Sequence, residues 1–142
     1  MKPVAHRAWG IAATIVVAAA VAYGFWIVGS PDSRRMERLD ERRLDHLKAI
    51  AYEMRELVYD PQDKVMRRAL FEDLDALKAG ARRRKLTLHD PESGAAYGFT
   101  VLDAHRYQLS ATFDGPRDLN WDVFWNHPGG EHTWTIDVRD TL

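Results

Sequence analysis

The sequence predicts an α+β protein in which a membrane helix and amphipathic helices come first and a small antiparallel sheet follows. Three observations lead to this fold class. An uncharged run, residues 9–28, stands near the N-terminus. Apolar residues then recur at spacings of three and four, the helical period, and after Lys85 the period changes to two, that of a strand. Helices followed by such strands can cover one face of the sheet.

Residues 9–28 predict a transmembrane helix. At about 1.5 Å of rise per residue they span roughly the 30 Å of a bilayer core. Trp9, Tyr23 and Trp26 fall near the two ends of the run, where interfacial aromatic anchors lie. We therefore expect a single-pass membrane protein, with the lipid bilayer as one partner.

A cleaved signal peptide is the alternative for the same run. Lys2 and Arg7 form a short basic segment before it. The apolar run is longer than the 7–15 residues of the apolar segment in a usual signal peptide, so an uncleaved anchor is favoured. Ala18 and Ala22, four residues apart, would allow a second helix to pack closely, which makes them candidate partner-binding residues, although alanine also serves as plain helix filler.

The chain is thus predicted to consist of a tail at residues 1–8, a transmembrane helix at 9–29 and an α+β domain at 30–142. A domain of about 113 residues can bury one modest core. A net charge of −1 predicts no nucleic-acid partner, and the one basic cluster, residues 82–85, resembles a solvated helix end. The absence of cysteine excludes disulfides and thiolate chemistry.

Two amphipathic helices are expected at the start of the domain. The first, residues 34–59, carries one apolar stripe, formed by Leu44, Leu47, Ile50, Ala51, Met54, Leu57 and Val58. It should end at Asp60, because the residue before a proline is driven out of the helical region. The second helix is predicted to begin at Pro61, with Asp60 as its cap, and to run to about Gly80.

Strands and turns are expected after Lys85. A short strand at 86–88 leads into a turn at 90–94, and two strands that contain 97–101 and 107–113 are joined by a hairpin loop at 103–105. A polar loop follows, then a turn at 127–130 and a final strand at 133–138. These segments complete the predicted antiparallel sheet.

Two motifs carry a family resemblance. The sequence places Asp90-Pro91-Glu92-Ser93-Gly94-Ala95-Ala96-Tyr97 before the paired strands. This layout resembles the pseudopilins of type II secretion, in which an Asp-Pro-x-x-Gly-x-Pro-Tyr turn precedes the sheet. It is more similar to bacterial single-pass proteins that carry such a domain outside pili and often have a His-Pro-x-Gly turn, as at 127–130 here. The resemblance implies a pseudopilin-like fold, a single-pass protein in the bacterial inner membrane and a periplasmic C-terminal domain.

The chain departs from that family at two places. Processed pilins have a Gly-Phe-Thr-x-x-Glu-like junction before the apolar helix, whereas Gly10 here is followed by Ile-Ala-Ala-Thr-Ile. We therefore expect neither cleavage nor polymerisation. In the non-pilus group, cysteines commonly stand at the positions of Ser110 and Thr133, where they could bridge the last strands.

The orientation of the anchor is left open by the sequence. Five arginines follow the apolar run closely: Arg34, Arg35, Arg38, Arg42 and Arg43. The positive-inside rule would place such a segment, and the domain after it, in the cytoplasm. The resemblance implies the opposite side, and we favour the periplasm.

The last third of the chain contains weak candidates for a metal site. They are Asp118, Asn120, Asp122, His127, Glu131 and His132. Their spacing matches neither a zinc motif nor a calcium loop, because Val123 stands where the calcium loop needs glycine. No metal, no cofactor and no catalytic residue is predicted.

Trp121 and Trp125 are candidate partner-binding residues. Core packing explains some of the tryptophans clustered in this third of the chain, and exposed aromatic side chains mark interfaces. The predicted function is that of a non-catalytic accessory or assembly subunit of a larger bacterial membrane complex, which binds other membrane subunits and no small-molecule substrate. A component of a type II secretion or pilus-like machine is the alternative, and a metal-dependent enzyme is a weaker one.

Overall fold

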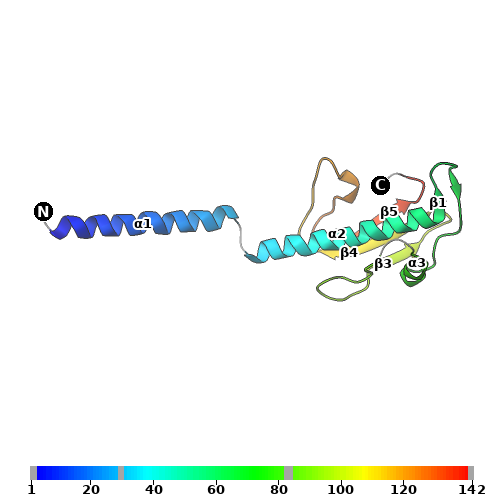
Figure 1. Cartoon of the computed structure of the whole chain (residues 1–142), viewed down its shortest axis with the longest axis horizontal. Coiled ribbons are helices and arrows are strands. Elements are labelled where there is room, and N and C mark those ends of the chain that lie inside the picture. The colour runs from blue at the N-terminus through cyan, green and yellow to red at the C-terminus, as the bar shows by residue number, and fades with distance from the viewer. Residues whose placement is uncertain (1–2, 29–30, 82–84, 141–142) are drawn as a thin grey trace. The chain divides into compact units, whose positions relative to one another are not determined.

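The computed structural model describes residues 3–28, 31–81 and 85–140, and the chain divides into two compact units, Met1–Arg35 and Met36–Leu142. The elements follow in the order α1 (Pro3–Val28), α2 (Pro31–Val58), β1 (Tyr59–Asp60), β2 (Val65–Met66), α3 (Leu74–Gly80), β3 (Gly98–Val101), β4 (Arg106–Phe113), η1 (Val123–Trp125) and β5 (Gly130–Asp137) (Figure 1). The predicted α+β class is confirmed.

Helix α1 contains most of the predicted membrane run. Its described side chains between Trp9 and Tyr23 are all exposed. Among the described residues, no helix combines the length and the apolar character needed to cross a membrane. The predicted span at 9–29 is therefore not confirmed; residue 29, like residues 1 and 2 of the predicted tail, lies outside the described residues, and the rest of that tail belongs to α1.

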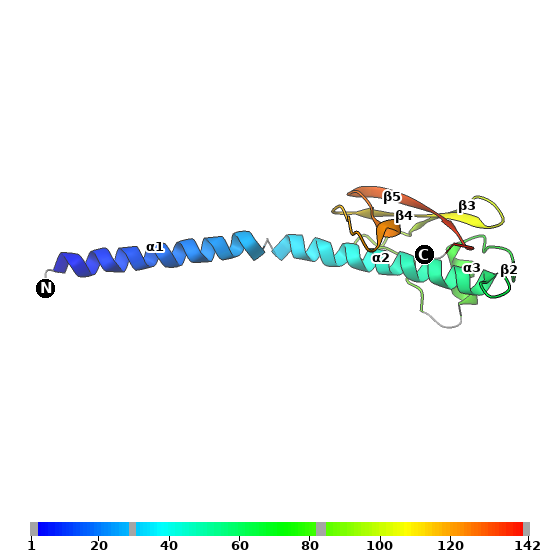
Figure 2. The same ribbon diagram turned by 90° about the horizontal axis from the view of Figure 1, so that it is seen from above.

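Helix α2 provides one half of the core. Its buried positions follow the predicted stripe and extend it toward the N-terminus: Leu39, Leu44, Leu47, Ile50, Ala51, Met54 and Val58. The long helix lies along one face of the main sheet (Figure 2). Side chains of alternate strand residues meet it there: Tyr107, Leu109, Ala111, Phe113, Trp134 and Ile136. Helix and sheet together thus bury a single core.

The main sheet is antiparallel and has the strand order β3-β4-β5. The hairpin loop at 103–105 joins β3 to β4, as predicted, and the register pairs Ser110 directly with Thr133. Gly98 lies opposite Ser110 on the other side, so close that a Cβ atom at position 98 would overlap the Ser110 hydroxyl. A side chain at this position would therefore require the Ser110 hydroxyl to rotate away.

The predicted second helix is wrong over most of its length. Residues 59–66 form a small antiparallel hairpin, in which Tyr59 pairs with Met66, and only Leu74–Gly80 is helical. The carboxylate of Asp60 accepts hydrogen bonds from the backbone N–H groups of Gln62 and Asp63. The Asp-Pro sequence thus closes a turn and does not cap a helix, because an aspartate side chain serves both structures equally well.

The short strand predicted at 86–88 is absent from the described structure. The alternation behind it is real, since Leu86 and Leu88 are 2% and 3% exposed. The backbone forms an isolated bridge between His89 and Ala96, and Tyr97 N donates to Leu88 O. The predicted turn at 90–94 lies inside this bridge, with Gly94 at φ 70°. The arginines at 82–84 lie outside the described residues.

Candidate partner-binding surface

The segment between β4 and β5, residues 114–129, forms a loop that we call the tryptophan loop. Its two arms are joined by a pair of backbone hydrogen bonds, Arg117 N to His127 O at 2.8 Å and His127 N to Arg117 O at 3.1 Å. The Asn126 side chain bridges the loop a second time: it accepts from Leu119 N at 2.8 Å and donates to Leu119 O at 3.2 Å. These bonds give the loop a fixed base.

The inner side of the tryptophan loop belongs to the core. Trp125 is only 3% exposed and packs 5.4 Å from Trp134, measured between ring centroids. The indole N–H of Trp134 donates to Phe124 O at 2.9 Å, which ties the loop to β5. Of the two tryptophans predicted to bind a partner, Trp125 is thus a core residue in this chain.

The outer side of the tryptophan loop exposes apolar side chains. Trp121 is 78% exposed, Val123 67% and Phe124 42%. The guanidinium of Arg117 lies 5.8 Å from the ring centroid of Trp121. Large apolar side chains grouped on a fixed loop are typical of protein interfaces. Trp121 therefore keeps its place as a candidate partner-binding residue.

Asp122 fastens the tryptophan loop to α2. Its carboxylate receives Lys48 Nζ at 2.6 Å and Arg117 Nη2 at 2.8 Å. Burial alone would raise the pKa of Asp122, but these two hydrogen bonds lower it below its ordinary value. The aspartate thus stays ionised and holds two cations beside Trp121 and Trp125.

The weak metal candidates make separate contacts in the structure. His127 is 5% exposed, stacks on Phe113 at 3.7 Å between centroids and contacts Pro128 O through Nδ1 at 3.0 Å; burial lowers its pKa. The ring of His132 packs against Trp134 at 4.5 Å. Within the described part of the chain, no group of three potential metal ligands comes together.

The remaining metal candidates are also apart. Asp118 accepts from Asn126 Nδ2 at 3.2 Å, and Asp122 is occupied by Lys48 and Arg117. Asn120 and Glu131 are exposed, Asn120 near the tip of the loop and Glu131 at the start of β5. The structure does not bring the six residues to one point.

Arg43 connects α2 to two loops of the domain, a role that the sequence did not reveal. It is 5% exposed and its guanidinium binds four carboxylates: Asp90, Asp40 at 2.7 Å, Asp114 at 2.6 Å and Glu92 at 3.3 Å. Asp40 also accepts hydrogen bonds from the backbone N–H groups of Asp114 and Gly115. One arginine of α2 thereby holds both the turn at 90–94 and the start of the tryptophan loop.

Burial and ion pairing oppose each other at this cluster. Burial alone would lower the pKa of Arg43, but its hydrogen bonds to Asp90, Asp114 and Asp40 raise it. Burial alone would raise the pKa of Asp90, but the bonds from Arg43 and from the backbone N–H groups of Ser93 and Glu92 hold it far below its ordinary value. A sequence signal existed: Arg43 falls on the helix face of Leu39 and Leu47, where a charge needs partners.

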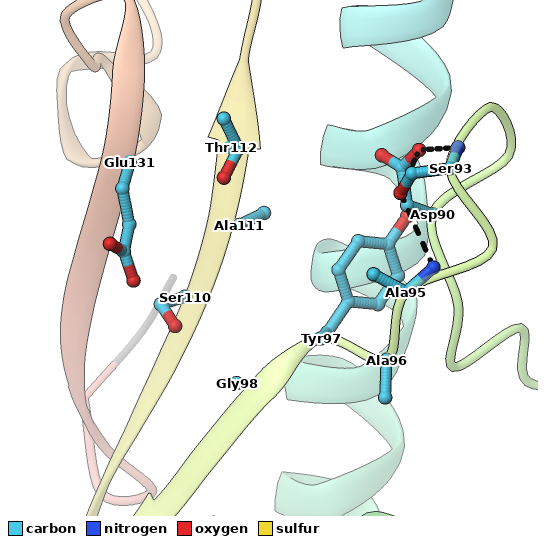
Figure 3. A pocket seen from close by; sticks show the side chains of 10 residues that line it. All are labelled: Asp90, Ser93, Ala95, Ala96, Tyr97, Gly98, Ser110, Ala111, Thr112 and Glu131. Carbon is cyan, nitrogen blue, oxygen red and sulfur yellow. Dashed lines mark hydrogen bonds between the residues drawn. The ribbon is translucent and has the colours of Figure 1, made fainter.

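A small cavity of about 240 Å³ opens where the chain before β3 leaves the edge of β4. Ser110, Thr112 and Glu131 lie on one wall and the segment from Asp90 to Tyr97 on the other (Figure 3). The Ser93 hydroxyl donates to Asp90 at 3.0 Å, and Asp90 also binds Arg43. The polar groups of that wall thus serve to close the turn.

The other predicted partner-binding residues, Ala18 and Ala22, lie in α1 and are exposed. Comparisons of the chain with protein-family models, with curated proteins and with solved structures find no match. The resemblance to pseudopilins therefore stays a prediction.

Proposed function

We propose that this protein is a non-catalytic accessory or assembly subunit of a larger bacterial membrane complex, anchored through α1 and carrying a pseudopilin-like domain in the periplasm. The observation that carries the proposal is the tryptophan loop. It presents three apolar side chains to solvent on a base that is held by Arg43, Asp122 and Asn126. Fixed, exposed aromatic groups suit binding of another protein.

The anchor is supported by the surface of α1. Ile11, Ile15 and Val17 are 62–63% exposed, and the run from residue 9 to 28 contains no charged side chain. Each apolar side chain of this size gains roughly 1.5–3 kcal/mol when it is removed from water. Lipid or the helices of other subunits would provide that burial, with Ala18 and Ala22 as the points of close helix contact.

Membrane attachment is tested by extraction of membranes from cells that produce the full chain. The chain should stay in the membrane after treatment with carbonate at high pH, and Val17→Arg should release it, because a charge at mid-bilayer is costly. Met36→Arg is the matched control, since Met36 is exposed in α2, outside the predicted span. Release of the unchanged chain would refute the anchor.

The subunit role is tested by gentle detergent extraction, native electrophoresis and mass spectrometry. The full chain should migrate with other membrane proteins, and Trp121→Ala should loosen that complex by roughly 2 kcal/mol or more. Migration of the wild-type chain alone would contradict the proposed role.

A component of a secretion or pilus-like machine is the second candidate. The observation that favours it is the order of elements, a long N-terminal helical region followed by an antiparallel sheet that packs on α2. The missing cleavage junction after Gly10 speaks against it. An N-terminus of the mature protein that begins after Gly10 would favour this candidate over the first.

A further inference from the structure

Strand β5 forms one edge of the main sheet, since it pairs with β4 on one side and with no strand of the described structure on the other. Figure 2 shows it along its whole length. An edge strand presents unpaired backbone N–H and C=O groups, which can pair with another chain.

The register identifies which groups of β5 are unpaired. Hydrogen-bonded pairs alternate along an antiparallel ladder. Val138 N donates to His105 O at 3.0 Å, so even-numbered residues of β5 direct their backbone groups toward β4. The odd-numbered residues Glu131, Thr133 and Thr135 therefore direct theirs outward, and within residues 85–140 none of these groups has a backbone hydrogen bond.

The free stretch has a defined end and lacks most of the features that block an edge. Asp137 O accepts from Asp140 N at 3.1 Å, which closes the edge beyond Thr135. Eight consecutive residues of β5 pair with β4 without an inserted residue, and the strand contains no proline and no lysine. Proteins commonly block a long edge with such residues or with a bulge, so this edge is left open to pairing.

The surroundings of the edge define the chemistry of what could bind. On the outer face, Glu131 is exposed and forms no ion pair with any described residue. On the helix side, Phe124 is 42% exposed and bonded to Trp134 of β5. A strand added here would place its side chains alternately beside Glu131 and beside the apolar side chains of the tryptophan loop.

We propose that residues 131–135 bind an extended segment of a partner protein by strand addition. That segment carries a lysine or arginine opposite Glu131 and apolar residues on the helix side. A second copy of this chain fits less well, because antiparallel pairing of the two free stretches places Thr135 opposite Glu131 and Thr133 opposite Thr133, so that Glu131 gains no cation. The proposal goes beyond the proposed function and does not depend on the anchor.

The test uses the full chain in detergent micelles and a panel of synthetic seven-residue peptides. Each peptide has Lys or Glu at its outer positions and Val, Leu or Phe at the alternate ones. We expect peptides with lysine to bind, and binding to slow amide hydrogen exchange at Glu131, Thr133 and Thr135. The amide of Val101, on the opposite edge strand β3, serves as the internal control.

Two further arms separate strand addition from simple charge attraction. A lysine peptide with N-methylated amides on one edge should bind at least ten-fold more weakly, and Glu131→Lys should reverse the preference between lysine and glutamate peptides. Thr133→Pro removes one outward N–H and should also weaken binding at least ten-fold, whereas Thr133→Val, which keeps that N–H, should not.

The results that would overturn the proposal are equally defined. They are the absence of exchange protection with every peptide, equal affinity of the N-methylated peptide, or protection of the three amides that appears with rising protein concentration and without peptide. The last result would assign the edge to a second copy. If Thr133→Pro fails to fold, the N-methylated peptide still decides the question on the unchanged chain.

Discussion

At the scale of single residues, Arg43 is the side chain on which the domain depends most. Arg43→Met leaves Asp40, Asp90 and Asp114 close together without their shared cation. Removal of one partner from a buried ion pair costs on the order of 3–5 kcal/mol. The free energy of unfolding, measured with urea, should fall by that amount. Arg42→Met is the control, because Arg42 is exposed and should change the stability by no more than about 0.5 kcal/mol.

The same cluster makes the stability depend on pH. The pKa of Asp90 is depressed in the folded chain, so its contribution is fully present above the pKa of an unfolded aspartate, about 3.9, and is lost progressively as the pH falls from that value toward the lower pKa of the folded chain. Urea unfolding between pH 7 and pH 3 should show this loss. In Arg43→Met the dependence should become flatter, since the pKa of Asp90 is no longer lowered by the guanidinium. An unchanged pH profile would contradict the role of Arg43.

The two tryptophans of the loop should behave in opposite ways. Trp125→Ala removes a buried ring and should lower the free energy of unfolding by about 3–5 kcal/mol. Trp121→Ala removes an exposed ring and should change it by no more than about 0.5 kcal/mol, while it weakens partner binding. Thermal unfolding of both variants beside co-purification of the complex tests the pair. Equal destabilisation by the two changes would place Trp121 in the core.

The sequence could not separate these two residues. Trp121 and Trp125 lie in one loop, and periodicity carries no information where the chain is irregular. Arg43 was hidden for a related reason: its partners Asp90 and Asp114 are 47 and 71 residues away in the chain. The position of Arg43 on the apolar face of α2 indicates that it needs partners, but no local pattern shows that Asp90 and Asp114 are among them.

At the scale of elements, the sheet and the long helix were predicted well because each has a clean period. Alternation located β3, β4 and β5, and the apolar stripe located α2. The second helix failed because Asp60 and Pro61 are equally suited to a helix start and to a tight turn. The structure contains the 59–66 hairpin, to which Arg67 Nη2 adds an ion pair with Asp60 at 2.6 Å.

The register of β4 and β5 allows a direct check of the sheet. Ser110 and Thr133 are paired across the strands, and the alternation makes theirs a non-hydrogen-bonded pair, in which Cα atoms lie about 4.5 Å apart. This separation permits a disulfide. A double variant with Ser110→Cys and Thr133→Cys should form a disulfide under mild oxidation. The disulfide should stabilise the chain by about 3 kcal/mol, if it acts by lowering the entropy of the unfolded chain. Each single cysteine variant is a control, and a failure to crosslink would show that the register is wrong.

At the scale of the whole molecule, the proposed anchor raises the question of the side of the membrane on which the domain would lie. Five arginines after the apolar run favour the cytoplasm by the positive-inside rule. In the folded domain Arg43 is neutralised by four carboxylates, but Arg38 and Arg42 stay exposed, and the rule counts residues before folding. The excess of arginine after the predicted anchor thus argues against a periplasmic domain, and folding of the domain does not remove this excess.

The orientation prediction is that the C-terminal domain is periplasmic. Alkaline phosphatase, which is active only outside the cytoplasm, should be active when it is fused after Leu142, and a cytoplasmic reporter at the same position should be silent. Replacement of Arg34, Arg38 and Arg42 by glutamine should raise the phosphatase signal further, because it reduces the positive charge on that flank. Replacement of Arg67, Arg106 and Arg139, which are exposed and lie far along the chain from the anchor, is the matched control and should leave the signal unchanged. Activity of the cytoplasmic reporter would show that the arginines after the anchor decide the topology and that the domain faces the cytoplasm.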